Sequence, residues 1–314
     1  MSLLPVEPAW RLAERKEEHR WLIAGLWSEQ AVGIVGGEPK CCKSFLALDL
    51  AVSVAAGTPC LRRFPVPRRG RVLLYAAEDA HHIVRQRLEG ICSAAGLALA
   101  DLDVQVITAP TVRLDLEIDR KALNATIAKL APRLLVLDPF VRLHRVDENA
   151  SGEVAPLLAY MRELQRRHGV AVTVVHHAKK GAARARAGQA LRGSSEFHAW
   201  GDSNLYLRRE GDALTLTVEH RAAPSPKPMR IELVQEAQAL ALQLANDRDP
   251  EPPVPNSLDE RIASALADAA SPIPFGQLRS QCRVRATTLY ERLAALTASG
   301  RVVKAGNGGY RLIG

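Results

Sequence analysis

The chain has 314 residues, 47% of them apolar and 24% charged, a globular composition that excludes wholesale disorder. Aromatic residues make up only 4%, which leaves little material for a base-stacking platform. Lysine and arginine outnumber aspartate and glutamate by 42 to 34, and the formal net charge of +8 favours a polyanionic partner without establishing one.

The amino-terminal half of the chain alternates between two kinds of pattern. Short apolar runs occupy residues 32–35, 72–75, 104–107, 134–137 and 170–175, and helical patterns occupy residues 44–56, 80–95, 120–130 and 153–168. Strands that are apolar on both faces and alternate with helices are typical of a parallel sheet covered by helices. We therefore predict an α/β fold with a mostly parallel central sheet. Three later runs, at residues 204–208, 214–218 and 231–234, are interpreted as antiparallel additions to it.

A polar, proline-rich stretch at residues 246–256 predicts a linker, because proline removes backbone donors and fixes φ. Beyond it, the patterns predict helices at residues 258–269, 275–281 and 286–298, and then strands at residues 301–304 and 309–313. Asn307-Gly308 between the two strands is a strong hairpin signal. This order predicts a winged helix-turn-helix. The predicted domains are residues 1–245, a linker at 246–256 and a small domain at 257–314.

Membrane insertion and disulfide bonding are not expected. No apolar run reaches the roughly 20 residues that a membrane span needs, and the amino-terminal residues show no signal-peptide core. The five cysteines form no CxxC pair, which is the pattern of a reducing compartment. We expect a cytoplasmic protein without a membrane partner.

The most informative segment lies between the first apolar run and the first helix. It has the context of a P-loop, in which backbone N–H groups and a helix N-terminus bind phosphate. Lys43 is expected at the β- and γ-phosphates of ATP, and the Ser44 hydroxyl on Mg²⁺. The predicted nucleotide-binding residues are Gly37, Glu38, Pro39, Lys40, Cys41, Cys42, Lys43, Ser44 and Phe45.

One position of this loop departs from the P-loop pattern. Cys42 stands where glycine normally precedes the lysine and lets the backbone approach the phosphate. A weakened or regulatory nucleotide site is one interpretation of this departure. A chance strand–loop–helix is the other reading of the segment.

Three further strand ends carry side chains suited to the same chemistry. Asp138 ends the run 134–137 and is expected to hold Mg²⁺. Glu78 follows the run 72–75 and is a candidate general base, although Glu78-Asp79 also suits an N-terminal cap for the next helix. His177 ends the run 170–175 and is a candidate γ-phosphate sensor, with a core-and-surface pair of histidines as the alternative. In a parallel sheet these residues converge on one edge.

In order and spacing, GGEPKCCKSFLALDLA, YAAEDA, LLVLDPF, VVHHAKK and LRGSS resemble the motifs of RepA-like hexameric helicases over residues 20–236. These are RecA-type ATPases of plasmids and mobile elements. The resemblance implies a RecA-like core, ATP hydrolysis between subunits, and a ring that commonly has six members. It also gives Lys43 and Ser44 the Walker-A roles, and it assigns Glu78, Asp138 and His177 as base, Walker-B residue and sensor.

Two arginines are candidates to act across the subunit interface. The resemblance favours Arg221 as the arginine finger, with Arg192 second. Glu219 stands where such helicases often have the lysine of Lys-x-Arg, so a piston lysine is missing. An exposed, salt-bridging Arg221 is the alternative.

Two basic regions are candidate DNA contacts. Residues 179–195 carry five cations and no acid, and loops at this place line the central channel of RecA-type rings; the alternative is a solvated loop. The tail, residues 257–314, has eight basic and four acidic residues, a balance of +4. Winged helices bind duplex DNA or protein. The predicted contacts are Lys179, Lys180, Arg184, Arg186, Arg283, Arg285, Thr287, Thr288, Arg292, Arg301 and Lys304.

Taken with these patterns, the resemblance implies an ATP-dependent ring helicase on single-stranded DNA, and the patterns add a winged-helix appendage. One alternative is an ATP-gated DNA-binding regulator or loader with slow hydrolysis and no unwinding. Another is a DNA-binding protein with a decayed P-loop, against which the retention of Lys43, Ser44, Glu78 and Asp138 argues.

Overall fold

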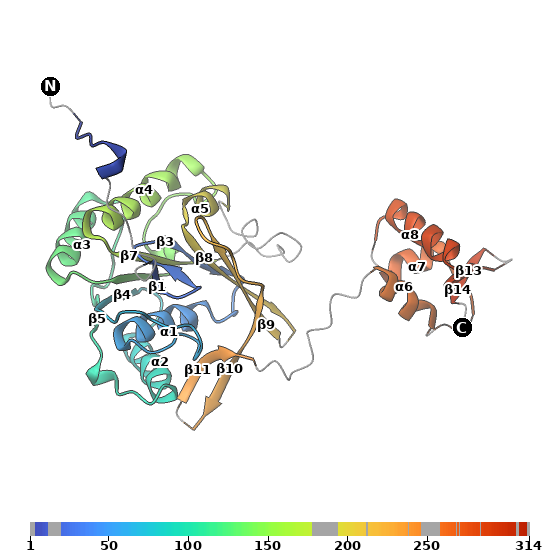
Figure 1. Ribbon diagram of the computed structural model, residues 1–314, viewed down its shortest axis with the longest axis horizontal. Helices are drawn as coiled ribbons and strands as arrows, with labels where there is room; N and C mark the ends of the chain where they lie inside the picture. Colours follow the sequence, from blue (N-terminus) through green and yellow to red (C-terminus); the bar gives the residue numbers. More distant parts are fainter. Residues whose placement is uncertain are drawn as a thin grey trace. The chain divides into compact units, whose positions relative to one another are not determined.

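The computed structural model divides the chain into two compact units, Met1–Ala245 and Asn246–Gly314 (Figure 1). It describes residues 4–11, 20–177, 194–211, 213–237, 239–245, 258–267, 269, 271–282, 284–305 and 308–312. The predicted linker, residues 246–256, lies outside the described residues. No helix in the described part is long and apolar enough to cross a membrane.

The larger unit is built on a nine-stranded sheet in the order β11-β10-β9-β8-β3-β7-β6-β4-β5. The six neighbouring strands β8-β3-β7-β6-β4-β5 are paired in parallel, whereas β8-β9, β9-β10 and β10-β11 are antiparallel pairs. The sheet is therefore mostly parallel, as predicted. The strands are β3 (Val32–Gly37), β4 (Val72–Ala76), β5 (Val104–Val106), β6 (Leu134–Asp138), β7 (Ala171–His177), β8 (Ser203–Glu210), β9 (Ala213–His220), β10 (Met229–Glu236) and β11 (Ala239–Leu244).

The antiparallel assignment was right for β9 and β10 and for the pairing of β8 with β9, but wrong for the pairing of β8 with β3. β8 runs parallel to β3, with Gly37 opposite Leu207. The segment between β7 and β8 contains the helix α5 (Ser194–Trp200), and a connection of this length lets the chain return to the same end of the sheet before starting β8. The strand β11 was not predicted.

Helices cover both faces of the sheet (Figure 1). One core contains α1 (Lys43–Ala56) and α2 (His81–Ala94), and the other contains α3 (Glu117–Leu130), α4 (Ser151–His168) and α5. Because β3, β6 and most of β4 and β7 are buried between these layers, their sequences are mostly apolar, with Asp138, Thr173 and His176 as buried polar exceptions. The helices confirm the four predicted patterns, with starts shifted by up to three residues. A short hairpin of β1 (Trp21–Ile23) and β2 (Trp27–Ser28) was not predicted.

The smaller unit has its own apolar core, with Ile262, Leu278, Leu289, Leu293 and Val302 among its buried residues. Its elements are α6 (Leu258–Ala267), β12 (Ile273–Pro274), α7 (Phe275–Cys282), α8 (Ala286–Ala298), β13 (Val302–Lys304) and β14 (Gly309–Leu312). The helices and the last two strands lie within two residues of the predicted bounds, and β12, which pairs with β14, was not predicted. The assignment of this unit as a winged helix-turn-helix stays a prediction.

Candidate active site

The carboxyl ends of four neighbouring parallel strands meet at one edge of the large sheet. Gly37, the last residue of β3, is paired in register with His177 at the end of β7. On the other side of β7 lies β6, whose last residue, Asp138, is opposite Ala76 at the end of β4. Glu78 follows two residues after Ala76. The convergence inferred from the strand pattern is therefore present in the fold.

The loop of residues 38–42 has a backbone that is unusual for its residue types. Gly37 has φ +153°, and a Cβ there would lie 2.3 Å from the carbonyl oxygen of Leu207, so only glycine fits beside β8. Lys40 and Cys42 both have positive φ, at 64° and 63°. Cys42 immediately precedes α1 and takes the left-handed conformation that glycine favours.

The first turn of α1 faces this loop. Its N–H groups lack partners within the helix, and the positive end of the helix dipole lies there, so the position in front of α1 is suited to an anion. The Lys43 side chain is buried and folds back so that Nζ donates to the carbonyl of Glu38 at 2.7 Å. Burial lowers the pKa of its ammonium group. The guanidinium of Arg87 lies over the ring of Phe45, with 5.4 Å between Cζ of Arg87 and the ring centroid.

Ser44 and Asp138 come together as predicted for a shared cation. The Asp138 carboxyl, on a residue that is 9% exposed, is hydrogen-bonded to the Ser44 side chain. Burial raises the pKa of Asp138 to about 6, and the hydrogen bond from Ser44 opposes this shift. A hydroxyl next to a carboxylate is a donor set that Mg²⁺ accepts. The residues present therefore fit the ion that the P-loop pattern implies.

Glu78 and Asp79 each form an ion pair with an arginine. Nε of Arg142 lies 3.0 Å from Oε1 of Glu78, and both side chains are largely exposed. Asp79 pairs with Arg87 of α2. The alternative reading of Glu78-Asp79 as a helix cap was wrong, because the cap position of α2 is Ala80 and has no side-chain capping hydrogen bond.

The two histidines that end β7 have different surroundings. His176 is buried and stacks on Phe197 of α5, with 4.2 Å between ring centroids. His177 is half-buried beside Gly37. His177 therefore lies at the same edge as the P-loop, whereas His176 belongs to the core.

Sequence reasoning missed two arginines at this edge. Arg142 lies in the 3-10 turn η4 (Phe140–Arg142), four residues beyond Asp138. Arg209, on β8, donates from Nε to the carbonyl of Lys40 at 3.3 Å and from Nη2 to Sγ of Cys42 at 3.5 Å. Neither has a sequence signal, because each reaches the site through strand pairing or a turn that no local pattern shows.

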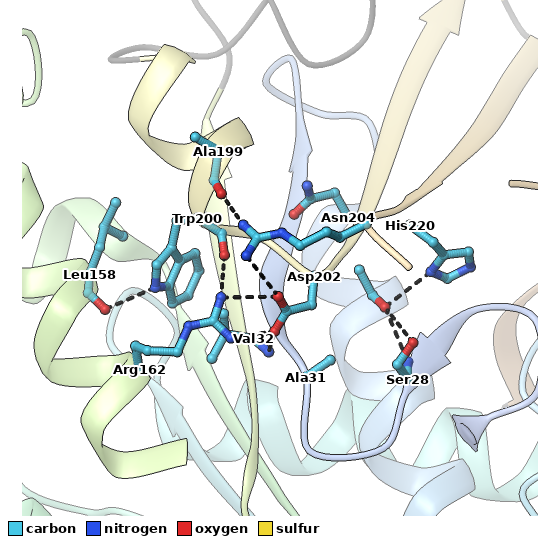
Figure 2. A network of polar contacts seen from close by, with 12 residues as sticks. Ser28, Ala31, Val32, Leu158, Arg162, Ala199, Trp200, Asp202, Asn204 and His220 are labelled. Atoms are coloured by element: carbon cyan, nitrogen blue, oxygen red, sulfur yellow. Dashed lines mark hydrogen bonds and ion pairs between the residues drawn. The ribbon is translucent and has the colours of Figure 1, made fainter. Parts of the chain in front are cut away.

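Arg221 lies at the opposite end of the strands from the P-loop, where the parallel strands begin. β9 runs antiparallel to β8, with His220 opposite Ser203, so its end meets the start of β8. Arg221 donates to the carbonyl of Ala199 and lies 3.5 Å from the carboxylate of Asp202. Figure 2 shows Asp202 in the same network with Arg162, and Asp202 also accepts from the N–H of Val32 at 3.2 Å. Arg221 is thus not brought together with the P-loop of its own chain.

The second arginine-finger candidate, Arg192, lies outside the described residues. So do several predicted DNA contacts: Lys179, Lys180, Arg184, Arg186 and Arg283. In the smaller unit, Arg285 directly precedes α8, and Thr287 and Thr288 are exposed on its first turn. Arg301 and Lys304 are exposed at β13. Arg292 differs from these residues, because its guanidinium binds both carboxylate oxygens of Asp259 on α6.

Comparison with known families places this geometry in context. Residues 2–183, more than half of the chain, match the AAA domain family. The match spans the P-loop and the strand ends with Glu78, Asp138 and His177. It ends before β8 and therefore does not include Arg209 or Arg221.

Proposed function

Because the chain belongs to the AAA domain family, a family of P-loop ATPases, we propose that it hydrolyses ATP as a ring-forming motor that translocates on single-stranded DNA. One observation carries the proposal: the residues suited to ATP hydrolysis meet at the carboxyl ends of the parallel strands. Lys43 and Ser44 begin α1 there, Asp138 ends β6, and Glu78 follows the end of β4. A RepA-like helicase is the most concrete form of this proposal, supported by the motifs shared over residues 20–236 and by the net charge of +8.

Each residue at this edge has one task in ATP hydrolysis. Lys43 leaves the Glu38 carbonyl and binds phosphate oxygens together with the N–H groups of the first turn of α1. Ser44 and Asp138 hold Mg²⁺, which supplies charge neutralisation on the phosphates. Glu78 accepts a proton from water as the water oxygen bonds to the γ-phosphorus and the bond to the bridging oxygen breaks, leaving ADP and inorganic phosphate. His177 contacts the γ-phosphate as its sensor.

The Arg221 proposal applies to a neighbouring subunit. Since Arg221 lies at the opposite edge from the P-loop of its own chain, we propose that it reaches the nucleotide of another copy in a ring, commonly of six members. That step requires the release of Arg221 from Asp202 and from the carbonyl of Ala199; the guanidinium is half exposed, and surface ion pairs are weak, at about 0–1 kcal/mol. Sedimentation velocity with and without MgATP tests this assembly, and a monomer under both conditions refutes it.

A second function, an ATP-gated DNA-binding regulator or loader, is favoured by two observations. Cys42 places a side chain where a P-loop normally has none. The carboxylate of Glu78 is held by Arg142 and must leave it before it accepts a proton from water. Both features favour slow hydrolysis with ATP binding retained.

Magnesium-dependent ATP hydrolysis, with and without single-stranded DNA, separates the two functions. For a motor we expect DNA to stimulate turnover, and Lys43→Ala and Glu78→Gln to abolish it, while the exposed Lys129→Ala serves as a matched control. For a regulator we expect tight ATP binding, negligible turnover, and DNA binding that survives Glu78→Gln. Lys43→Ala with wild-type ATP binding refutes the nucleotide site in either form.

We further propose that the smaller unit is a winged helix that binds duplex DNA. Support comes from Arg285, Thr287 and Thr288 at the start of α8 and from Arg301 and Lys304 at β13, which are the positions where such folds contact bases and backbone. Fluorescence anisotropy of labelled duplex tests this proposal in the full chain. The double variant Arg285→Ala/Arg301→Ala is expected to weaken binding and to flatten its salt dependence.

A further inference from the structure

The strand β8 places a cation next to the nucleotide-binding loop. Leu207 pairs with Gly37, the last residue of β3, so Arg209 lies two residues beyond the end of β3, level with the loop. Side chains alternate along a strand. Leu205 and Leu207 belong to the core that contains α1, whereas Tyr206 belongs to the core on the other face. Arg209 therefore projects from the face that α1 covers, and its neighbour Arg208 from the other face.

The contacts of Arg209 are with the loop itself. The carbonyl of Lys40 accepts from Nε at 3.3 Å, and Sγ of Cys42 accepts from Nη2 at 3.5 Å. The 3.3 Å distance to the carbonyl oxygen is long for a guanidinium, that oxygen carries no formal charge, and sulfur is a weak acceptor. Within the described residues, these two contacts bring no negative charge to the guanidinium, which lies at a loop whose geometry is suited to phosphate. Phosphate oxygens are much better partners for arginine, because they are charged and fit its planar fork.

We propose that Arg209 is a second phosphate-binding cation of the nucleotide site, acting beside Lys43. The inference rests on the proposed function and adds a residue from outside the stretch that matches the AAA domain family. Without nucleotide, the guanidinium lies on Lys40 and Cys42. With nucleotide, it exchanges these neutral acceptors for phosphate oxygens. The thiol of Cys42 thus gives Arg209 a hydrogen-bond acceptor that a glycine at the same position does not provide.

Titration calorimetry of the full chain with MgATP and MgADP tests the inference. Hydrogen bonds to charged groups are strong enough that we expect Arg209→Ala to weaken MgATP binding by about tenfold or more. Arg209→Lys keeps the charge and is expected to retain part of the affinity. Arg208→Ala, one residue away on the other face, is the matched control and is expected to stay within about twofold of wild type. The melting temperature of the nucleotide-free protein is measured for every variant.

The outcomes separate this inference from the proposed function. Loss of affinity in Arg209→Ala with an unchanged melting temperature and partial rescue by lysine supports a phosphate contact. A lowered melting temperature with no rescue by lysine overturns it, because Arg209 then only holds the loop. Wild-type affinity in Arg209→Ala, alongside lost binding in Lys43→Ala, also overturns the inference and leaves the proposed function intact. Wild-type affinity in Lys43→Ala refutes the nucleotide site and the inference with it.

Discussion

The left-handed backbone of Cys42 predicts that glycine stabilises this protein at a position inside its own binding loop. With φ 63° and ψ 25°, a residue that has a Cβ is strained by about 1–2 kcal/mol. Glycine relieves this strain, but its freer unfolded chain costs about 0.4–1 kcal/mol. The difference leaves Cys42→Gly more stable than Cys42→Ala by about 0.5–1 kcal/mol. For a unit of this size we expect a rise in melting temperature of about 2 °C.

Alanine is the right comparison because both variants remove Sγ, which packs against the core and contacts Arg209. Only the glycine variant removes the Cβ as well. Ala125→Gly, at an exposed position of α3, is a control that should lower the stability, because glycine in a right-handed helix costs about 1 kcal/mol. Calorimetry of the nucleotide-free protein measures all three. If Cys42→Gly melts at or below Cys42→Ala, the loop does not hold the left-handed conformation and the reasoning is refuted.

Three other substitutions have directions fixed by the structure. Gly33→Ala places a Cβ 1.7 Å from the carbonyl oxygen of Ser203 in β8, so we expect the free energy of unfolding, measured with urea, to fall by several kcal/mol. A fall of less than about 1 kcal/mol would contradict the pairing of β3 with β8. Burial raises the pKa of Asp138 from 3.8 to about 6. As pH rises through that range, ionisation of Asp138 therefore lowers the free energy of unfolding by up to about 3 kcal/mol. Asp138→Asn is therefore expected to stabilise the nucleotide-free protein at pH 8 but not at pH 4. Arg292→Ala breaks a surface pair with Asp259, and we expect little change in melting temperature and a duplex affinity closer to wild type than that of Arg285→Ala.

The parts of this fold that were predictable depend on local patterns. Runs that are apolar on both faces predicted the buried strands β3, β4, β6 and β7, and their alternation with helices predicted that these strands are parallel. Parallel strands end at one edge, so the approach of Ser44 to Asp138 followed without knowledge of any contact. The AAA domain match agrees with this interpretation of the loop.

The parts that were not predictable depend on pairing between distant segments. The residues of β8 from Ser203 to Leu207 are buried on both faces, and nothing in their sequence states whether the strand lies parallel to β3. Arg209 reaches Lys40 across 169 positions of sequence, and its role follows only from that pairing. Likewise, Arg221 was assigned by its resemblance to a motif, whereas its distance from the P-loop of its own chain follows from the direction of β9.

Two features of the site favour slow hydrolysis, and their magnitudes rank them. The ion pair between Glu78 and Arg142 is exposed, so breaking it costs at most about 1 kcal/mol, or roughly a fivefold effect on rate. A side chain at Cys42 acts on the position of the phosphate, where a displacement of about 1 Å costs roughly 100-fold. We therefore expect Arg142→Ala to raise kcat by no more than about fivefold and Cys42→Gly to raise it more. If steady-state hydrolysis shows the reverse order, the ion pair, and not the loop, limits turnover.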